Sequence, residues 1–112
     1  MHIELRRIIL FTPNMERMTA FYRDVLGLKV IGREKGWVDF DAGPCRIALH
    51  AGNSEPGKRP PKLNFYASDV ATTRAALIKK GAKFGKVVST PHFDMCGGKD
   101  PEGNVIGLSA RK

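Results

Sequence analysis

The 112-residue sequence has no apolar run near the roughly 20 residues that span a bilayer, which argues against a membrane-spanning helix. No apolar stretch with a small-residue cleavage site opens the chain, so no export signal is predicted and we expect a cytoplasmic protein. There are only two cysteines, Cys45 and Cys96. We expect both to be free thiols, because a chain of this length can bury an adequate core without a disulfide.

The sequence also lacks the short motifs that identify a chemistry. It has no glycine-rich phosphate loop, no Cys-x-x-Cys pair and no Ser/His/Asp set with the spacing of a known family. Lys and Arg outnumber Asp and Glu by 19 to 11, but they cluster only at Lys79-Lys80 and around Lys58–Lys62. Without a zinc-finger or RNP-like motif, this pattern favours a solvated basic surface, and we expect no nucleic-acid partner.

The first half of the chain predicts one strand, one helix and three further strands. β-Branched and aromatic residues indicate a strand over Ile3–Phe11. Apolar residues at three- and four-residue spacing predict an amphipathic helix from Met15 to Leu26, closed by Gly27. Short strands are then predicted over 28–32, 36–40 and 45–50.

The second half predicts the same order after a Pro- and Gly-rich linker over about 53–61. A strand is predicted over Leu63–Ala67, followed by a helix that starts at Val70 with Ser68 or Asp69 as its N-cap. Three further strands are predicted over 83–88, 92–96 and 104–109, with a tight turn before the last.

The two halves align with each other. Phe11–Met15 matches Tyr66–Val70, and Gly27–Val30 matches Gly81–Phe84 in the same order. This correspondence supports a duplicated βαβββ module, over about 1–52 and about 62–112.

Two motifs within this repeat resemble those of a known family. Phe21–Leu28 reads FYRDVLGL and resembles the helix end of vicinal-oxygen-chelate proteins, and Asp100–Asn104 reads DPEGN and resembles their hairpin. The resemblance to this glyoxalase, bleomycin-resistance and extradiol-dioxygenase superfamily covers essentially the whole chain. It implies an α+β fold in which two βαβββ modules form a curled mixed sheet, or cup, and it implies a homodimer.

The same resemblance locates a metal site. Metal-dependent members hold one divalent ion through His, Gln or Glu on the first and last strand of each module, and the matching positions here are Arg7, Ala48, Leu63 and Gly107. None of these residues supplies imidazole, carboxylate or thiolate. We therefore expect no metal in the usual site and no cofactor, while a divalent ion belongs to the alternative in which other ligands such as His50 take over.

The resemblance implies that His50 and Arg7 face the cup, where each is a candidate for a catalytic or ligand-binding role. His50 is a candidate general base or ligand-orienting donor, or a histidine at a strand end without a role. Arg7 either replaces the metal as the positive centre for an anionic ligand, or forms an internal pair with Asp39 or Asp41.

A further set of side chains is suited to lining a pocket, although most of its apolar members are also suited to the core. His92, Asp94 and Cys96 alternate along one predicted strand and have metal-ligand chemistry, but collinear residues rarely surround an ion, so pocket lining or plain surface is the alternative. Gly97-Gly98 indicates a strand end that passes close to another segment. The candidate ligand-binding residues are Arg7, Phe11, Trp37, Ala48, His50, Phe65, Met95 and Gly107.

These observations lead to three hypotheses for function. The first is a protein that binds a small anionic or aromatic ligand in the cup without the usual metal. The second is a metal-dependent lyase, isomerase or ring-cleaving dioxygenase of the same superfamily, with shifted ligands such as His50 and His92. The third is an adaptor for nucleic acid or protein that uses the basic surface.

Overall fold

The computed structural model describes all residues, Met1–Lys112. Its contacts divide the chain into Met1–Glu55, called unit 1, and Pro56–Lys112, called unit 2. Residues 53–61, the predicted linker, contain no helix or strand. None of the helices has the length and the apolar composition that crossing a membrane would require.

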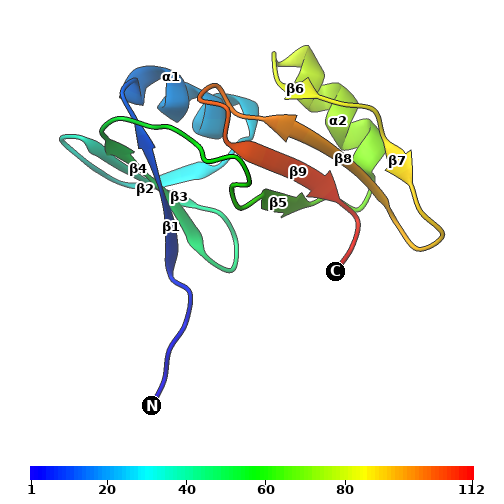
Figure 1. The fold of residues 1–112 in the computed structure, drawn as a ribbon, viewed down its shortest axis with the longest axis horizontal. Helices are drawn as coiled ribbons and strands as arrows, with labels where there is room; N and C mark the ends of the chain where they lie inside the picture. Colours follow the sequence, from blue (N-terminus) through cyan, green and yellow to red (C-terminus); the bar gives the residue numbers. More distant parts are fainter. The chain divides into compact units, whose positions relative to one another are not determined.

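Unit 1 is a βαβββ module (Figure 1). Its elements in chain order are β1 (Arg7–Thr12), α1 (Met15–Ala20), the π-helix η1 (Phe21–Val25), β2 (Lys29–Glu34), β3 (Trp37–Asp41) and β4 (Arg46–Ala51). The four strands form a mixed sheet in the order β1-β4-β3-β2, in which β1 and β4 are parallel and the other pairs are antiparallel.

Unit 2 repeats this order of elements. Its elements are β5 (Leu63–Tyr66), α2 (Val70–Lys79), β6 (Lys83–Phe84), β7 (Val88–Ser89), β8 (Asp94–Lys99) and β9 (Val105–Ser109). The sheet order is β5-β9-β8-β6, with β7 also pairing with β8, and only β5 and β9 run parallel. The predicted α+β fold of two βαβββ modules is therefore confirmed.

The two modules begin and end their helices in the same way, which explains the alignment of the halves. Asn14 caps α1 by accepting a hydrogen bond from the Arg17 amide, and Asp69 caps α2 by accepting one from the Thr72 amide. Gly27 and Gly81 follow the helices with φ of 76° and 101°, a backbone conformation that favours glycine. Local capping chemistry thus defines both helices.

Several element boundaries differ from the predicted ones. The first strand begins at Arg7 and not at Ile3, because its partner β4 begins at Arg46 and offers no ladder beyond it. The predicted first helix consists of the α-helix α1 followed by the π-helix η1. In η1 the hydrogen bonds span five residues, as where the Leu26 amide donates to the Phe21 carbonyl. The predicted strand over 83–88 is split into β6 and β7.

The predicted strand over 92–96 is also displaced. His92 lies outside β8, in a turn where the Thr90 hydroxyl accepts hydrogen bonds from the amides of His92 and Phe93. The predicted triplet of His92, Asp94 and Cys96 on one strand is therefore wrong. The two cysteines are free thiols, as predicted.

In each unit a helix covers one face of the sheet. In unit 1, Met18 and Tyr22 are fully buried, and the Tyr22 ring contacts Phe40 of β3. In unit 2, α2 buries Val70 against Cys96 and Leu108, which lie on adjacent strands. We call the opposite face of each sheet its open face. Side chains alternate along a strand, so the immediate neighbours of these core residues on each strand point to the open face.

Candidate functional site

On the open face of unit 1, Arg7 of β1 pairs with Asp39 of β3. Arg7 Nε lies 3.1 Å from Asp39 Oδ1 and Nη2 lies 3.0 Å from Oδ2, which makes the contact bidentate. The Asp39 side chain is only 8% exposed, and Arg46 Nη1 lies 3.5 Å from the same Oδ2. Of the two roles open to Arg7, the structure shows the internal pair with Asp39. The half-exposed Arg46 gives this cluster an excess of positive charge.

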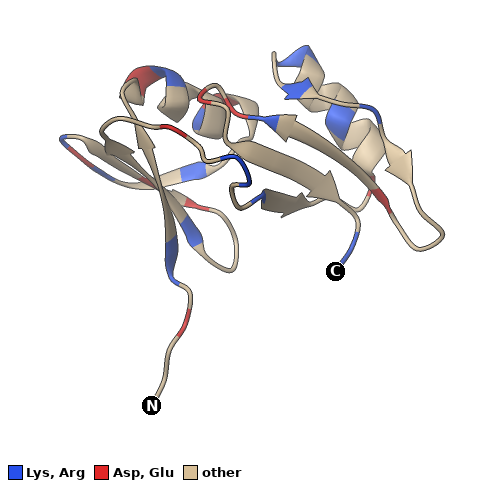
Figure 2. Cartoon of the chain, viewed as in Figure 1, with Lys and Arg blue, Asp and Glu red and all other residues tan.

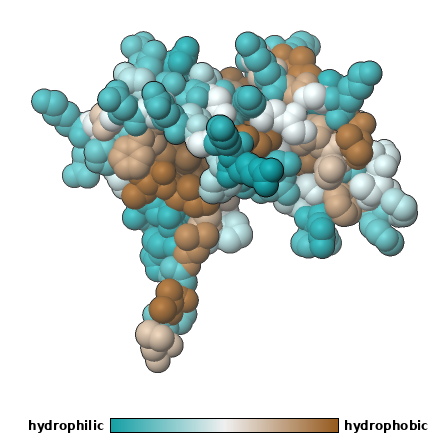
Figure 3. Space-filling view, in the orientation of Figure 1, coloured by the Kyte–Doolittle hydropathy of each residue, from teal (hydrophilic) through white to brown (hydrophobic).

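Three aromatic rings stand beside this cluster, and we call Phe11, Trp37 and His50 the aromatic platform. The His50 ring lies 5.2 Å from the Phe11 ring and 6.0 Å from the Trp37 ring, which it meets edge to face. The Arg7 guanidinium lies 5.5 Å from the Trp37 ring centre. Figure 3 shows hydrophobic residues gathered over β1 on the face seen there.

The His50 ring has a defined hydrogen-bonding state within the platform. Its Nδ1 lies 2.8 Å from the Ala51 carbonyl oxygen. A carbonyl oxygen only accepts, so Nδ1 is the donor in this bond. The bond and the two ring contacts fix the orientation of the exposed His50 ring within the platform.

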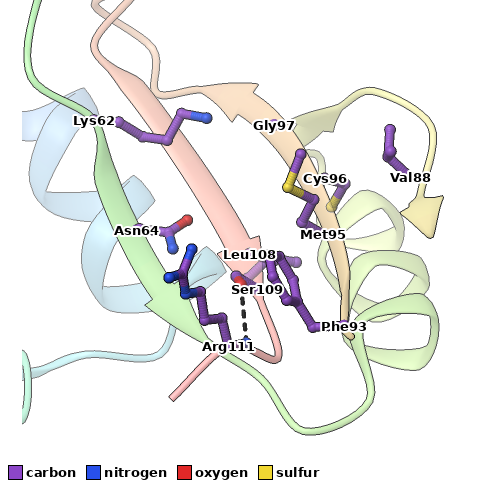
Figure 4. A pocket seen from close by; sticks show the side chains of 10 residues that line it. All are labelled: Lys62, Asn64, Val88, Phe93, Met95, Cys96, Gly97, Leu108, Ser109 and Arg111. Carbon is purple, nitrogen blue, oxygen red and sulfur yellow. Dashed lines mark hydrogen bonds between the residues drawn. The ribbon is translucent and has the colours of Figure 1, made fainter. Parts of the chain in front are cut away.

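Unit 2 contains a pocket of about 290 Å³, shown in Figure 4. Lys62, Asn64 and Arg111 form its polar side, beside β5, whereas Phe93 and Met95 lie on the side of β8 (Figure 4). The Arg111 guanidinium lies 5.6 Å from the Phe93 ring centre, and the Arg111 amide donates to Ser109 Oγ at 3.0 Å. The complete lining is Lys62, Asn64, Val88, Phe93, Met95, Cys96, Gly97, Leu108, Ser109 and Arg111.

The electrostatics of this pocket favour anions. It contains two cationic side chains and no acidic one, and neither Lys62 nor Arg111 forms an ion pair. Unit 2 has 11 Lys and Arg against four Asp and Glu, a net charge of +7, whereas unit 1 has eight against seven, a net charge of +1. Nearly all of the chain's net charge of +8 therefore belongs to the unit that contains the pocket.

Cys96 lies under the pocket and is only 4% exposed. Burial raises the pKa of its thiol, because the low-dielectric interior disfavours the thiolate. A thiol with a raised pKa is a poor nucleophile at neutral pH, so the pocket is better suited to binding than to thiolate chemistry.

The predicted site residues are divided between the two open faces and one core. Five of them lie on the open face of unit 1, in neighbouring pairs of the strand register: Arg7, Phe11, Trp37, Ala48 and His50. In unit 2, Met95 lines the pocket and Gly107 pairs with Asn64 on the same face. That these residues contact a ligand stays a prediction.

Phe65 is placed differently from the other candidates. It packs against the core under α2, while its neighbour Asn64 takes the open face. The sequence contained a signal for this, because the alignment of Phe11 with Tyr66 pairs Phe65 with the inward-facing Leu10. The pocket residues that sequence reasoning missed are Lys62, Asn64, Val88, Phe93, Ser109 and Arg111, which become neighbours only through strand pairing.

The donor set of the chain does not fit the metal site that the family resemblance implies. Arg7 is committed to Asp39, and Ala48 and Gly107 have no ligating side-chain atom. Leu63, the residue predicted at the fourth position, pairs with the buried Ile106 and faces the core. The structure has no group of three or more His, Cys, Asp or Glu side chains that could hold an ion. The residues at these positions therefore do not fit a divalent ion.

Comparison with known proteins defines the family. A family model described as the Glyoxalase/Bleomycin resistance protein/Dioxygenase superfamily matches residues 2–108. The chain therefore belongs to this superfamily. Among proteins of curated function, none matches the sequence significantly.

Solved structures agree with this fold. A putative glyoxalase family protein from Bacillus anthracis has a TM-score of 0.82 and 23% identity, and the match covers 100% of this chain and 98% of that one. A glyoxalase/bleomycin resistance protein/dioxygenase from Nocardioides has a TM-score of 0.82 and 19% identity, with coverage of 97% and 83%. Lactoylglutathione lyase from Agrobacterium tumefaciens has a TM-score of 0.75 and 20% identity, with coverage of 95% and 92%.

Proposed function

We propose that the protein binds a small organic anion with an aromatic or aliphatic body, without a divalent metal ion, in the pocket of unit 2. The observation that carries this proposal is that two cations without an ion-pair partner, Lys62 and Arg111, line one pocket together with the apolar side chains of Phe93 and Met95. A carboxylate or similar group would accept hydrogen bonds from the guanidinium and the Asn64 amide, while its body packs against the apolar side.

The size of the pocket limits the ligand. A volume of about 290 Å³ is just below the usual range for ligand sites, which begins near 300 Å³. We expect a compact molecule of one or two rings or of similar aliphatic bulk. We also propose that the protein acts as a homodimer, as the family resemblance implies, and that it is located in the cytoplasm.

The experiment compares 1-naphthoate with its neutral analogue 1-naphthamide by isothermal titration calorimetry. The carboxylate should bind saturably, and the amide should bind at least about tenfold more weakly because it offers no charge to Lys62 and Arg111. The variant Lys62→Gln/Arg111→Gln should lose the preference for the carboxylate.

The matched control is Lys29→Gln/Lys35→Gln, which removes the same charge from exposed positions in unit 1. Its affinity for 1-naphthoate should stay near that of the unaltered protein. Equal affinity for acid and amide, or an equal loss in both double variants, would contradict an anion site in this pocket.

The oriented ring of His50 favours a second candidate, proton-transfer catalysis. The probe is lactoylglutathione, the compound in the name of one structural relative. Turnover that is lost in His50→Gln and needs no added divalent ion would support catalysis by the platform. Absence of turnover would leave ligand binding as the proposed activity.

A further inference from the structure

Two lysines face each other across the outer strands of the unit 2 sheet. Lys83 of β6 and Lys99 of β8 are direct partners in the antiparallel register. Side chains in such positions lie close together on one face, and like charges there are destabilising. Neither lysine forms an ion pair that would offset the repulsion. An anion bound between them would relieve it.

These lysines border a groove of about 430 Å³ at the end of α2. Its floor is apolar and consists mainly of Ile78, Ala82 and Phe84, with Ile78 38% exposed. The Phe84 ring lies over Gly98, where an added Cβ would come within 2.8 Å of the ring. The register places the side chains of Lys83 and Lys99 on the sheet face opposite Phe84, so the apolar floor and the two lysines lie on either side of the edge strand β6.

The surroundings extend the positive charge. From Val70 to Lys99 the chain has six Lys and Arg and a single acidic residue, Asp94. Figure 2 shows basic residues along α2 and on β6. Lys79 and Lys80 have a structural explanation, since cations stabilise a helix C-terminus. That explanation does not apply to Lys83 and Lys99.

We propose that this groove binds an extended acidic segment of another protein that lies along the edge strand β6, so that its carboxylates meet Lys83 and Lys99 on one face of the sheet and its alternate, apolar side chains contact Ile78 and Phe84 on the other. A second copy of this chain does not fit as the partner, because Asp39 and Asp100, which begin its two segments of alternating acidic residues, are buried. Nucleic acid fits less well, because Phe84 packs on Gly98 and does not stand free for a base to stack on. The groove shares no residue with the pocket of the proposed function.

The test is fluorescence anisotropy with three probes that carry the same dye. They are a short peptide of alternating Glu and Val, the same peptide with Lys in place of Glu, and oligothymidine. The Glu peptide should bind the protein, and its affinity should fall as salt is added. The Lys peptide should not bind.

The informative variant is Lys83→Glu, because it turns the repulsion with Lys99 into attraction and should not lower the thermal midpoint. We expect it to weaken binding of the Glu peptide by about tenfold. Ile78→Ser should also weaken binding, whereas Lys35→Glu, an equal change of charge at an exposed position of unit 1, should have little effect. No binding of the Glu peptide, equal losses in Lys83→Glu and Lys35→Glu, or tighter binding of oligothymidine would overturn the proposal.

Discussion

Arg7 reaches Asp39 across an intervening strand, because β4 lies between β1 and β3 and presents only the small side chain of Ala48 beside Asp39. Arg7 and Ala48 are also the positions at which the family resemblance places metal ligands in the first module. At the first of these two positions, this chain has an internal ion pair between Arg7 and Asp39.

This pair predicts a cost in stability. Arg7→Met should lower the free energy of unfolding by about 2 kcal/mol, because it leaves the buried Asp39 carboxylate with only the longer contact to Arg46. Urea denaturation measures the change. The double variant Arg7→Met/Asp39→Asn should recover part of the loss. A single variant as stable as the unaltered protein would mean that Asp39 does not depend on Arg7.

Gly98 and Gly97 form a matched pair for testing the close approach of β6 to β8. A Cβ on Gly98 would come within 2.3 Å of the Lys83 carbonyl oxygen, whereas a Cβ on Gly97 meets nothing within 4 Å. Gly98→Ala should therefore cost about 3 kcal/mol of unfolding free energy, and Gly97→Ala close to none. Thermal and urea unfolding of the two variants would separate them, and equal effects would refute this packing.

Gly107 tests the polar side of the pocket. A Cβ there would lie 2.6 Å from Asn64 Oδ1, so Gly107→Ala should displace the exposed Asn64 side chain at little cost in stability. Loss of one hydrogen bond of about 1 kcal/mol should weaken 1-naphthoate binding about fivefold. Asn64→Ala should have a similar effect, and the double variant should lose no more than either. Additive losses would show that Gly107 acts by another route.

The two thiols should react at different rates. Burial raises the pKa of Cys96, so its thiolate is scarce at mildly alkaline pH, and Cys45 is more exposed. Iodoacetamide followed by mass spectrometry should show Cys45 modified first. Folding raises the pKa of the Cys96 thiol. The contribution of Cys96 to the free energy of unfolding is therefore fully present below the ordinary thiol pKa and is lost as the pH rises through the pKa of the folded state. Equal labelling rates at pH 8 would contradict this burial.

Chelation should leave ligand binding unchanged. The positions that match the family's metal ligands have no suitable donor, so excess EDTA should not alter the affinity for 1-naphthoate. Elemental analysis of the dialysed protein gives an independent measure. One tightly held ion per chain, with affinity lost on chelation, would show that other residues form a metal site.

Much of the fold was predictable because its signals are local. Asn14 and Asp69 cap helices through their own neighbours, and Gly27 and Gly81 end them with a backbone conformation that other residues avoid. The Asp100–Asn104 turn is equally local, with the Asp100 carboxylate accepting from the amides of Glu102 and Asn104. Such signals repeat with the module, so the sequence alone determined the two-module architecture and the family.

The site depended on contacts between distant segments. Only strand pairing decided that Arg7 binds Asp39, since the sequence left Asp41 as an equal alternative. Register decided that Asn64 and not Phe65 takes the open face, because a shift of one residue exchanges the two faces of a strand. Lys62 precedes β5 and Arg111 follows β9, so the parallel pairing of these strands sets the two cations at opposite ends of the strand pair, from which both line one pocket. Periodicity along the chain specifies elements, whereas the chemistry of the open faces is set by which elements pair and in which register.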